Sequence, residues 1–203
     1  EEVNHWSFKK LAHQPVPERV EGFASDSPID SFVREKLTNC QLTPAPTAGC
    51  GTLIRRLSFD LRGLPPSEEE LRSFTEDTRQ DPWSPLVDQM LASPHFGERW
   101  GRHWLDLAGF AESDGGSLND PERPYAWRYR DYVVESLNAN LPIDRFFQEQ
   151  LAGDEMIQES VDPENAAHQR LLSATGFLLM APDATRVSNT LEDRNNAAAE
   201  VVK

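Results

Sequence analysis

Residues 93–131 read SPHFGERWGRHWLDLAGFAESDGGSLNDPERPYAWRYRD, and the rest of the chain is organised around this stretch. It holds three of the five tryptophans of the protein. Apolar residues at helical spacing flank an acidic, glycine-rich loop at 112–122, which predicts two amphipathic helices joined by that loop. The first helix is predicted to pack through a stripe of Trp100, Trp104 and Leu107. A loop held between two anchored helices is a common place for binding groups.

Start and stop signals divide the remaining chain into short helices. Ser67 and Glu70 have the spacing of a capping box, which predicts a helix start. Gly63, followed by prolines, predicts a helix end. The other predicted helices begin at Pro28, near Leu53, after Asp81, after Pro124 and at Pro142, and a last one runs over 166–180 with a break near Gly176.

These signals predict an all-α fold, an irregular or orthogonal multi-helix bundle with an extended N-terminal arm. The arm covers residues 1–26, and its Trp6 and Phe8 are expected to pack against the body of the protein. The helical domain covers residues 27–203. The C-terminal residues 197–203 have high helix propensity and end on Val201-Val202-Lys203 without a cap, which suggests truncation from a larger multidomain protein.

Composition limits the partners of the chain. Its 34 acidic residues against 20 basic ones give a formal net charge of −14, which repels polyanions, so nucleic-acid binding is not expected. No run of 18 apolar residues is present, so no transmembrane segment is predicted. The first residues do not resemble a signal peptide, and a removed one would leave no trace.

Cys40 and Cys50 lack CxxC, CxxCH or Cys/His metal spacing, so no haem attachment is predicted within these residues. In an exported protein the two cysteines could form a disulfide across a short proline-bearing loop. Two free thiols are the alternative, and the sequence leaves both open.

Three longer runs resemble a known family. They are LIRRLSFDLRGLPP at 53–66, the 93–115 part of the opening stretch, and RPYAWRYRDYVVESLNANLPIDRFFQEQLAGD at 123–154. Together they resemble the second domain of the planctomycete cytochrome c-associated proteins, a family of unknown function. The resemblance implies an extracytoplasmic location, periplasmic or at the cell surface, with the signal peptide removed. It also implies other domains of a parent protein as partners, including a cytochrome c domain, with haem c in adjacent regions and none in this chain.

One candidate site lies at the mouth of the acidic loop. His103 and Asp106 are three residues apart on one predicted helix, and Glu112 and Asp114 follow. Glu112 and Asp114 could hold a divalent cation beside His103, although no established metal spacing is matched. Alternatively, His103 is a buried histidine hydrogen-bonded to Asp106.

The same residues could carry catalysis. His103 would act as a general base oriented by Asp106, with Arg123 beside them, in an oxidoreductase or a polysaccharide-active enzyme. Glu112 and Asp114 could share acid and base roles on a sugar.

A second candidate site follows the loop. Tyr125, Trp127 and Arg128 could form an aromatic platform for carbohydrate, or could be core residues with a charged rim. Arg130 and Asp131 are expected to join a polar network with Asp106 or Glu112.

Three functions therefore remain. The first is a module that forms an interface, or a ligand site, next to a haem domain. The second is an enzyme built on the polar cluster, and the third is a purely structural spacer.

Overall fold

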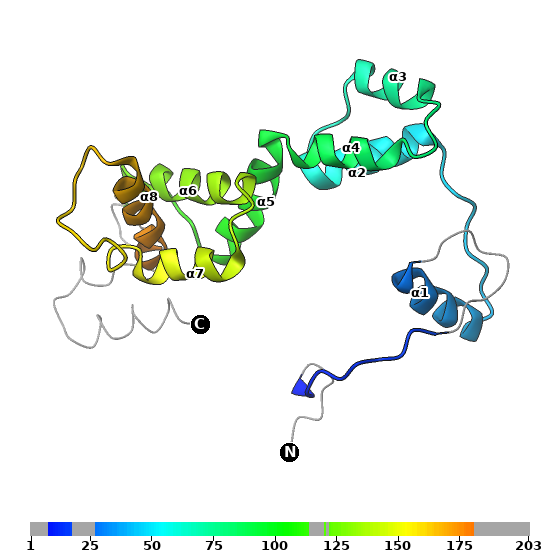
Figure 1. Cartoon of the computed structure of the whole chain (residues 1–203), viewed down its shortest axis with the longest axis horizontal. Helices are drawn as coiled ribbons and strands as arrows, with labels where there is room; N and C mark the ends of the chain where they lie inside the picture. The colour runs from blue at the N-terminus through cyan, green and yellow to red at the C-terminus, as the bar shows by residue number, and fades with distance from the viewer. Residues whose placement is uncertain (1–7, 18–26, 114–119, 121, 181–203) are drawn as a thin grey trace. The chain divides into compact units, whose positions relative to one another are not determined.

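The computed structural model of the chain describes residues 8–17, 27–113, 120 and 122–180 (Figure 1). Over these residues the chain forms helices and no β-strand, which confirms the predicted all-α class. The helices are α1 (Pro28–Asn39), α2 (Cys50–Arg62), α3 (Glu68–Glu76), α4 (Trp83–Leu91), α5 (Pro94–Leu107), α6 (Ala126–Asn138), α7 (Ile143–Ala152), α8 (Ala166–Ala174) and the 3-10 helix η2 (Thr175–Leu179). None of these helices is long and apolar enough to cross a membrane.

The chain divides into two compact units, Glu1–Ala48 and Gly49–Lys203. The first contains the described part of the arm and α1. Phe8 is 77% exposed and Trp6 lies outside the described residues, and the packing of the arm against the body stays a prediction. The predicted domain boundary after residue 26 stays a prediction.

In the second unit, α2, α3 and α4 surround a small core of Ile54, Phe74, Leu86 and Met90. The predicted helix end at Gly63 and helix start at Ser67 are both confirmed here. Gly63 ends α2 with a left-handed φ of 71°, and Ser67 and Glu70 form a complete capping box at the start of α3. Arg62 donates to the Glu70 carboxylate at 2.8 Å, which ties α2 to α3.

Helix α5 packs against α6 through glycines. A Cβ on Gly97 would collide with the Val134 carbonyl oxygen, and one on Gly101 would lie 3.3 Å from Val134 Cγ2. Because glycine lets the two backbones approach closely, α5 buries its Gly97, Gly101 and Leu105 face. The predicted packing stripe is therefore wrong for Trp100 and Leu107, which are 43% and 79% exposed.

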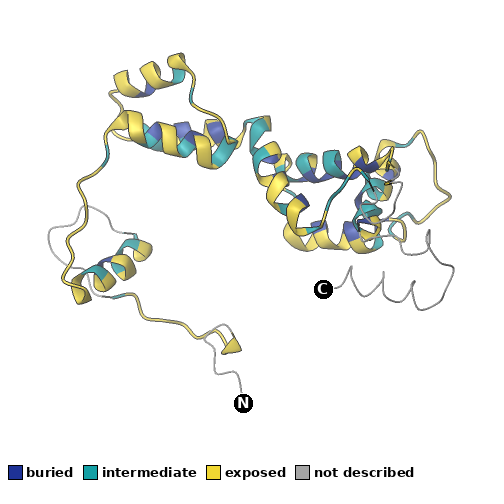
Figure 2. Ribbon diagram, turned by 180° about the vertical axis from the view of Figure 1, so that it is seen from behind, coloured by how far each residue is buried: buried dark blue, intermediate teal, exposed yellow. Residues whose placement is uncertain are grey.

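The main core lies between α5, α6, α7, α8 and η2. Its buried members are Leu105, Tyr129, Tyr132, Val133, Phe146, Ala174 and Met180. The predicted break near Gly176 is confirmed, since α8 ends at Ala174 and the chain continues as η2. A Cβ on Gly176 would lie 2.9 Å from Tyr129 Cβ, so only glycine brings η2 this close to α6. Figure 2 shows the buried faces of these helices turned toward one another.

Candidate functional site

His103 and Asp106 both lie on the exposed side of α5. The His103 ring meets the Trp100 ring edge-on at 5.4 Å between centroids, and Asp106 pairs with Arg102 at 3.9 Å. Although both side chains are described, no hydrogen bond joins them. The predicted buried histidine bonded to Asp106 is therefore wrong, because α5 turns its glycine face, and not this one, toward α6.

The base of the acidic loop is closed by backbone pairing. Ser113 and Glu122 form an antiparallel bridge, and the Arg123 N–H donates to the Glu112 carbonyl at 2.8 Å. The Arg130 guanidinium lies 3.3 Å from the Glu112 carboxylate and 3.0 Å from that of Asp131. The predicted polar network is thus confirmed with Glu112 as its member.

Asp114 lies outside the described residues. Within the described ranges, no group of three or more histidine, cysteine, aspartate and glutamate side chains is placed to hold a metal ion. The divalent-cation site at Glu112 and Asp114 stays a prediction.

Tyr125 and Trp127 lie at the surface, 69% and 46% exposed, so they are not core residues. The Arg128 guanidinium sits 5.3 Å from the Tyr125 ring centroid and 5.5 Å from that of Trp127, within cation–π range. The residues of the predicted platform are therefore brought together, and a carbohydrate ligand stays a prediction. Cys40 and Cys50 are exposed free thiols in the structure, and their pairing likewise stays a prediction.

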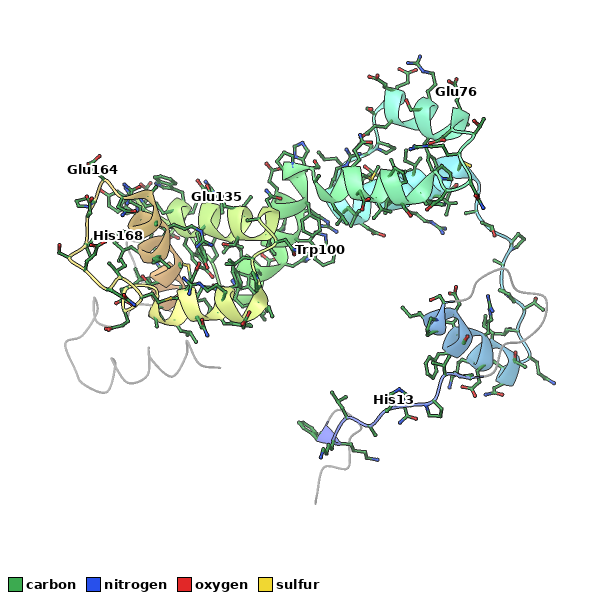
Figure 3. All side chains as sticks on the ribbon, viewed as in Figure 1. His13, Glu76, Trp100, Glu135, Glu164 and His168 are labelled. Atoms are coloured by element: carbon green, nitrogen blue, oxygen red, sulfur yellow. The ribbon has the colours of Figure 1, made fainter. Side chains whose placement is uncertain are left out.

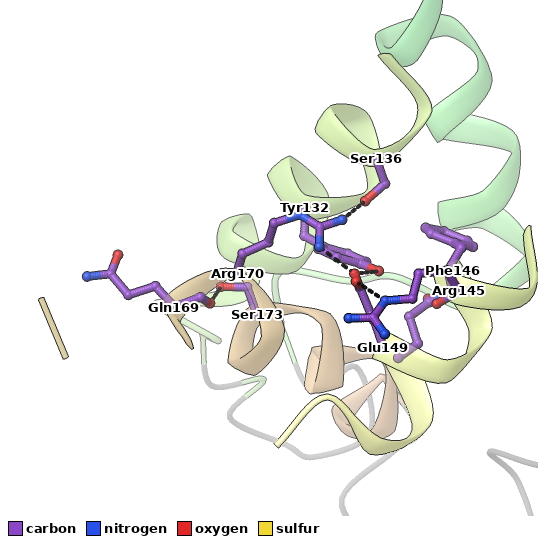
Figure 4. A network of polar contacts seen from close by, with 9 residues as sticks. Tyr132, Ser136, Arg145, Phe146, Glu149, Gln169, Arg170 and Ser173 are labelled. Carbon is purple, nitrogen blue, oxygen red and sulfur yellow. Dashed lines mark hydrogen bonds and ion pairs between the residues drawn. The ribbon is translucent and has the colours of Figure 1, made fainter. Parts of the chain in front are cut away.

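A buried polar network, which the sequence did not predict, centres on Glu149 of α7 (Figure 4). Glu149 is only 1% exposed. Its carboxylate accepts hydrogen bonds from Arg145 at 2.9 Å, from Arg170 at 2.6 Å and from the Tyr132 hydroxyl at 3.0 Å. Arg170 also donates to Ser136 at 3.2 Å and lies 5.0 Å from the Tyr132 ring centroid. One carboxylate thus joins α6, α7 and α8.

A second buried group continues the network toward α5. The Tyr129 hydroxyl donates to Gln150 Oε1 at 2.6 Å, and Trp104 Nε1–H lies 2.9 Å from Tyr129 Oη and 3.0 Å from Gln150 Oε1. Burial raises the pKa of Tyr129 and of Tyr132 well above the usual range, and for Tyr132 the Glu149 charge acts in the same direction. Both phenols therefore stay protonated and act as hydrogen-bond donors.

One sequence signal could have located this network. Phe146, Glu149 and Gln150 share one face of α7 at spacings of three and four, so a core-facing Phe146 places both polar residues in the core. Buried polar groups with complete partners stabilise a single packing of the helices. The network is thus best described as the rigid centre of the bundle.

An aromatic surface lies on α5 beside its glycine face. Trp100, labelled in Figure 3, and Leu107 lie one helical turn before and after Trp104 and are exposed. Trp104 itself is half-buried, and the Tyr129 and Gln150 hydrogen bonds fix its indole. A contiguous exposed apolar surface is typical of binding sites.

The fold and site together define an acidic, all-helical domain with a rigid polar centre and an outward aromatic face. A family model described as "PSCyt2: Protein of unknown function (DUF1549)" matches residues 28–203. The chain therefore belongs to this family, the planctomycete cytochrome c-associated family of unknown function, as its sequence motifs indicated. No curated protein and no solved structure matches the chain.

Proposed function

We propose that the chain is an exported helical module of a larger cytochrome c-associated protein and that it forms an interface with a haem-carrying domain. The observation that carries this proposal is the outward aromatic face of α5. Family membership supports the kind of partner, since the family is associated with cytochrome c.

The exposed residues have the character of an interface anchor. Trp100 is 43% exposed and Leu107 is 79% exposed, and large apolar groups of this kind provide much of the binding energy in protein interfaces. Because Trp104 between them is held by two hydrogen bonds, the surface is ordered before a partner arrives. Such preorganisation lowers the entropy cost of association.

The enzyme alternative has less support from the contacts. His103 and Asp106 are both exposed, and Asp106 pairs with Arg102. A purely structural spacer would not require an exposed tryptophan and leucine on its most aromatic helix. The interface role therefore explains more of the structure.

Binding to a haem protein tests the proposal directly. The 203-residue chain is titrated against a purified monohaem cytochrome c with a basic haem edge, by calorimetry and by the shifts of the haem methyl resonances in NMR. We expect saturable binding that weakens as salt is added. Unchanged haem resonances and no heat of binding would contradict the proposal.

Export is tested separately. A host cell expressing the full-length precursor is fractionated, and we expect the module in the extracytoplasmic fraction. Recovery only from the cytoplasm would contradict this part of the proposal.

A further inference from the structure

We infer that the binding surface extends from α5 across to α7 and that its occupant is a protein face with an apolar centre and a basic rim. This inference deepens the proposed function by giving the location of the interface and the chemistry of the partner. It rests on the proposed function only in taking the partner to be a haem protein.

The outer face of α7 carries a second apolar stripe. Ile143, Phe147 and Leu151 follow one another at intervals of four residues, so they share one face of the helix. They are 63%, 44% and 58% exposed. The adjoining face of the same helix holds Phe146, Glu149 and Gln150 in the core. Helix α7 is thus apolar on a face that no described part of the chain buries.

Trp104 connects the two stripes into one surface. Its ring meets the Phe147 ring edge-on at 5.5 Å between centroids and the Phe146 ring at 5.0 Å. On α5, Trp100 and Leu107 lie one turn to either side of Trp104. The joined surface, called the α5/α7 face below, consists of Trp100, Trp104, Leu107, Ile143, Phe147 and Leu151.

The charges beside the α5/α7 face select the partner. On α7, Asp144 follows Ile143 directly, and Asp154 and Glu155 come three and four residues after Leu151. On α5, the exposed Arg102 is paired with Asp106. Arg145 is bound to the buried Glu149, whereas Asp144, Asp154 and Glu155 are exposed. An apolar centre next to an acidic rim is complementary to an apolar centre with a basic rim.

The same charges disfavour two other occupants. A second copy would bring the same acidic rim and a net charge of −14 of its own. A membrane rich in anionic lipid would also be repelled. A basic protein surface is the occupant that satisfies both the apolar and the electrostatic features.

A pair of peptides without haem tests this inference independently of the cytochrome. One is an amphipathic helical peptide of about 18 residues with leucine on one face and lysine elsewhere, and the other has glutamate in place of lysine. Binding of each labelled peptide to the 203-residue chain is measured by fluorescence anisotropy. We expect the lysine peptide to bind saturably and the glutamate peptide not to bind.

Matched variants locate the binding. Ile143→Ser with Leu151→Ser should weaken binding of the lysine peptide by at least about tenfold. Leu42→Ser, which alters a leucine 60% exposed in the other unit, should leave binding unchanged. Circular dichroism confirms that each variant is folded. Asp154→Asn with Glu155→Gln, which leaves the apolar residues in place, should weaken binding and reduce its salt dependence.

The outcomes are distinct. Equal binding of the two peptides would overturn the inferred basic rim of the partner. Unchanged binding in the Ile143/Leu151 variant would overturn the location, and unchanged binding in the charge variant would overturn the role of the acidic rim. Binding of the lysine peptide at this face without binding of the cytochrome c would support the inference and contradict the proposed function.

Discussion

Arg170 Nη1 lies 2.6 Å from Glu149 Oε2, and this ion pair joins α8 to α7 around a carboxylate that is almost completely buried. The Tyr132 hydroxyl of α6 donates to the same oxygen at 3.0 Å. Three helices from separate parts of the sequence therefore depend on one side chain. Removing the carboxylate would leave the charges of Arg145 and Arg170 without their shared partner, which costs free energy. The stability of the bundle should therefore depend on Glu149.

Glu149→Gln should lower the free energy of unfolding by about 2 to 3 kcal/mol, because Arg145 and Arg170 lose their shared negative partner. The measurement is urea denaturation followed by far-UV circular dichroism. Glu135→Gln is the matched control, since Glu135 is exposed on α6 (Figure 3) and should change stability by less than about 0.5 kcal/mol. Equal effects of the two substitutions would contradict the role of the network.

The buried tyrosines should make the fold sensitive to high pH. The pKa values of Tyr129 and Tyr132 are raised, so the folded state holds these protons more tightly than the unfolded state. Their contribution to stability is complete below pH 10 and is lost as the pH rises above it. In a Tyr125→Phe variant, which leaves these as the two remaining tyrosines, absorbance at 295 nm should rise only together with the loss of helical ellipticity. Ionisation before unfolding would contradict their burial.

Glu70 should make α2 and α3 sensitive to acid. Its hydrogen bond from Arg62, and then that from the Ser67 backbone N–H, lower the pKa of Glu70 to about 2. A lowered pKa contributes stability above pH 4.5, and this contribution is lost as the pH falls through about 2. Glu70→Gln should therefore cost about 1 kcal/mol at pH 7 and progressively less as the pH approaches 2. Urea midpoints of both proteins over this range test it, with exposed Glu69→Gln as the control.

The α5–α6 contact should tolerate no larger residue at Gly97. Gly97→Ala should lower stability by about 2 kcal/mol or more, because the new methyl group meets the backbone of α6. Gly51→Ala in α2 is the matched control, since its new Cβ would meet only Leu71 Cδ1 at 3.8 Å. It should stabilise the protein by about 0.5 kcal/mol through reduced entropy of the unfolded chain. The measurement is the thermal and urea midpoint of each variant, and a neutral Gly97→Ala would contradict the close packing.

Local signals in the sequence predicted the helices well because their causes are local. The Ser67 capping box, the left-handed Gly63 and the break near Gly176 each depend on residues within a few positions. The Arg130–Glu112 ion pair could also be predicted from the sequence, since the two residues lie on either side of the same loop.

The candidate site was less predictable. Trp100 and Leu107 have the spacing of a packing stripe, yet they are exposed. Helical periodicity identifies an apolar face but does not tell whether a neighbouring helix covers it. Here the face with Gly97 and Gly101 packs against α6, because glycine allows the two backbones to approach closely.

The sequence by itself determined the all-α class, most helix boundaries, the acidic charge and the family. Only the tertiary structure decided that Glu149, Tyr132 and Arg170 meet in the core and that the aromatic side of α5 faces outward. Caps, turns and charge are properties of neighbouring residues. The meeting of α6, α7 and α8 at one carboxylate depends on contacts between residues 17 and 21 positions apart, which packing alone selects.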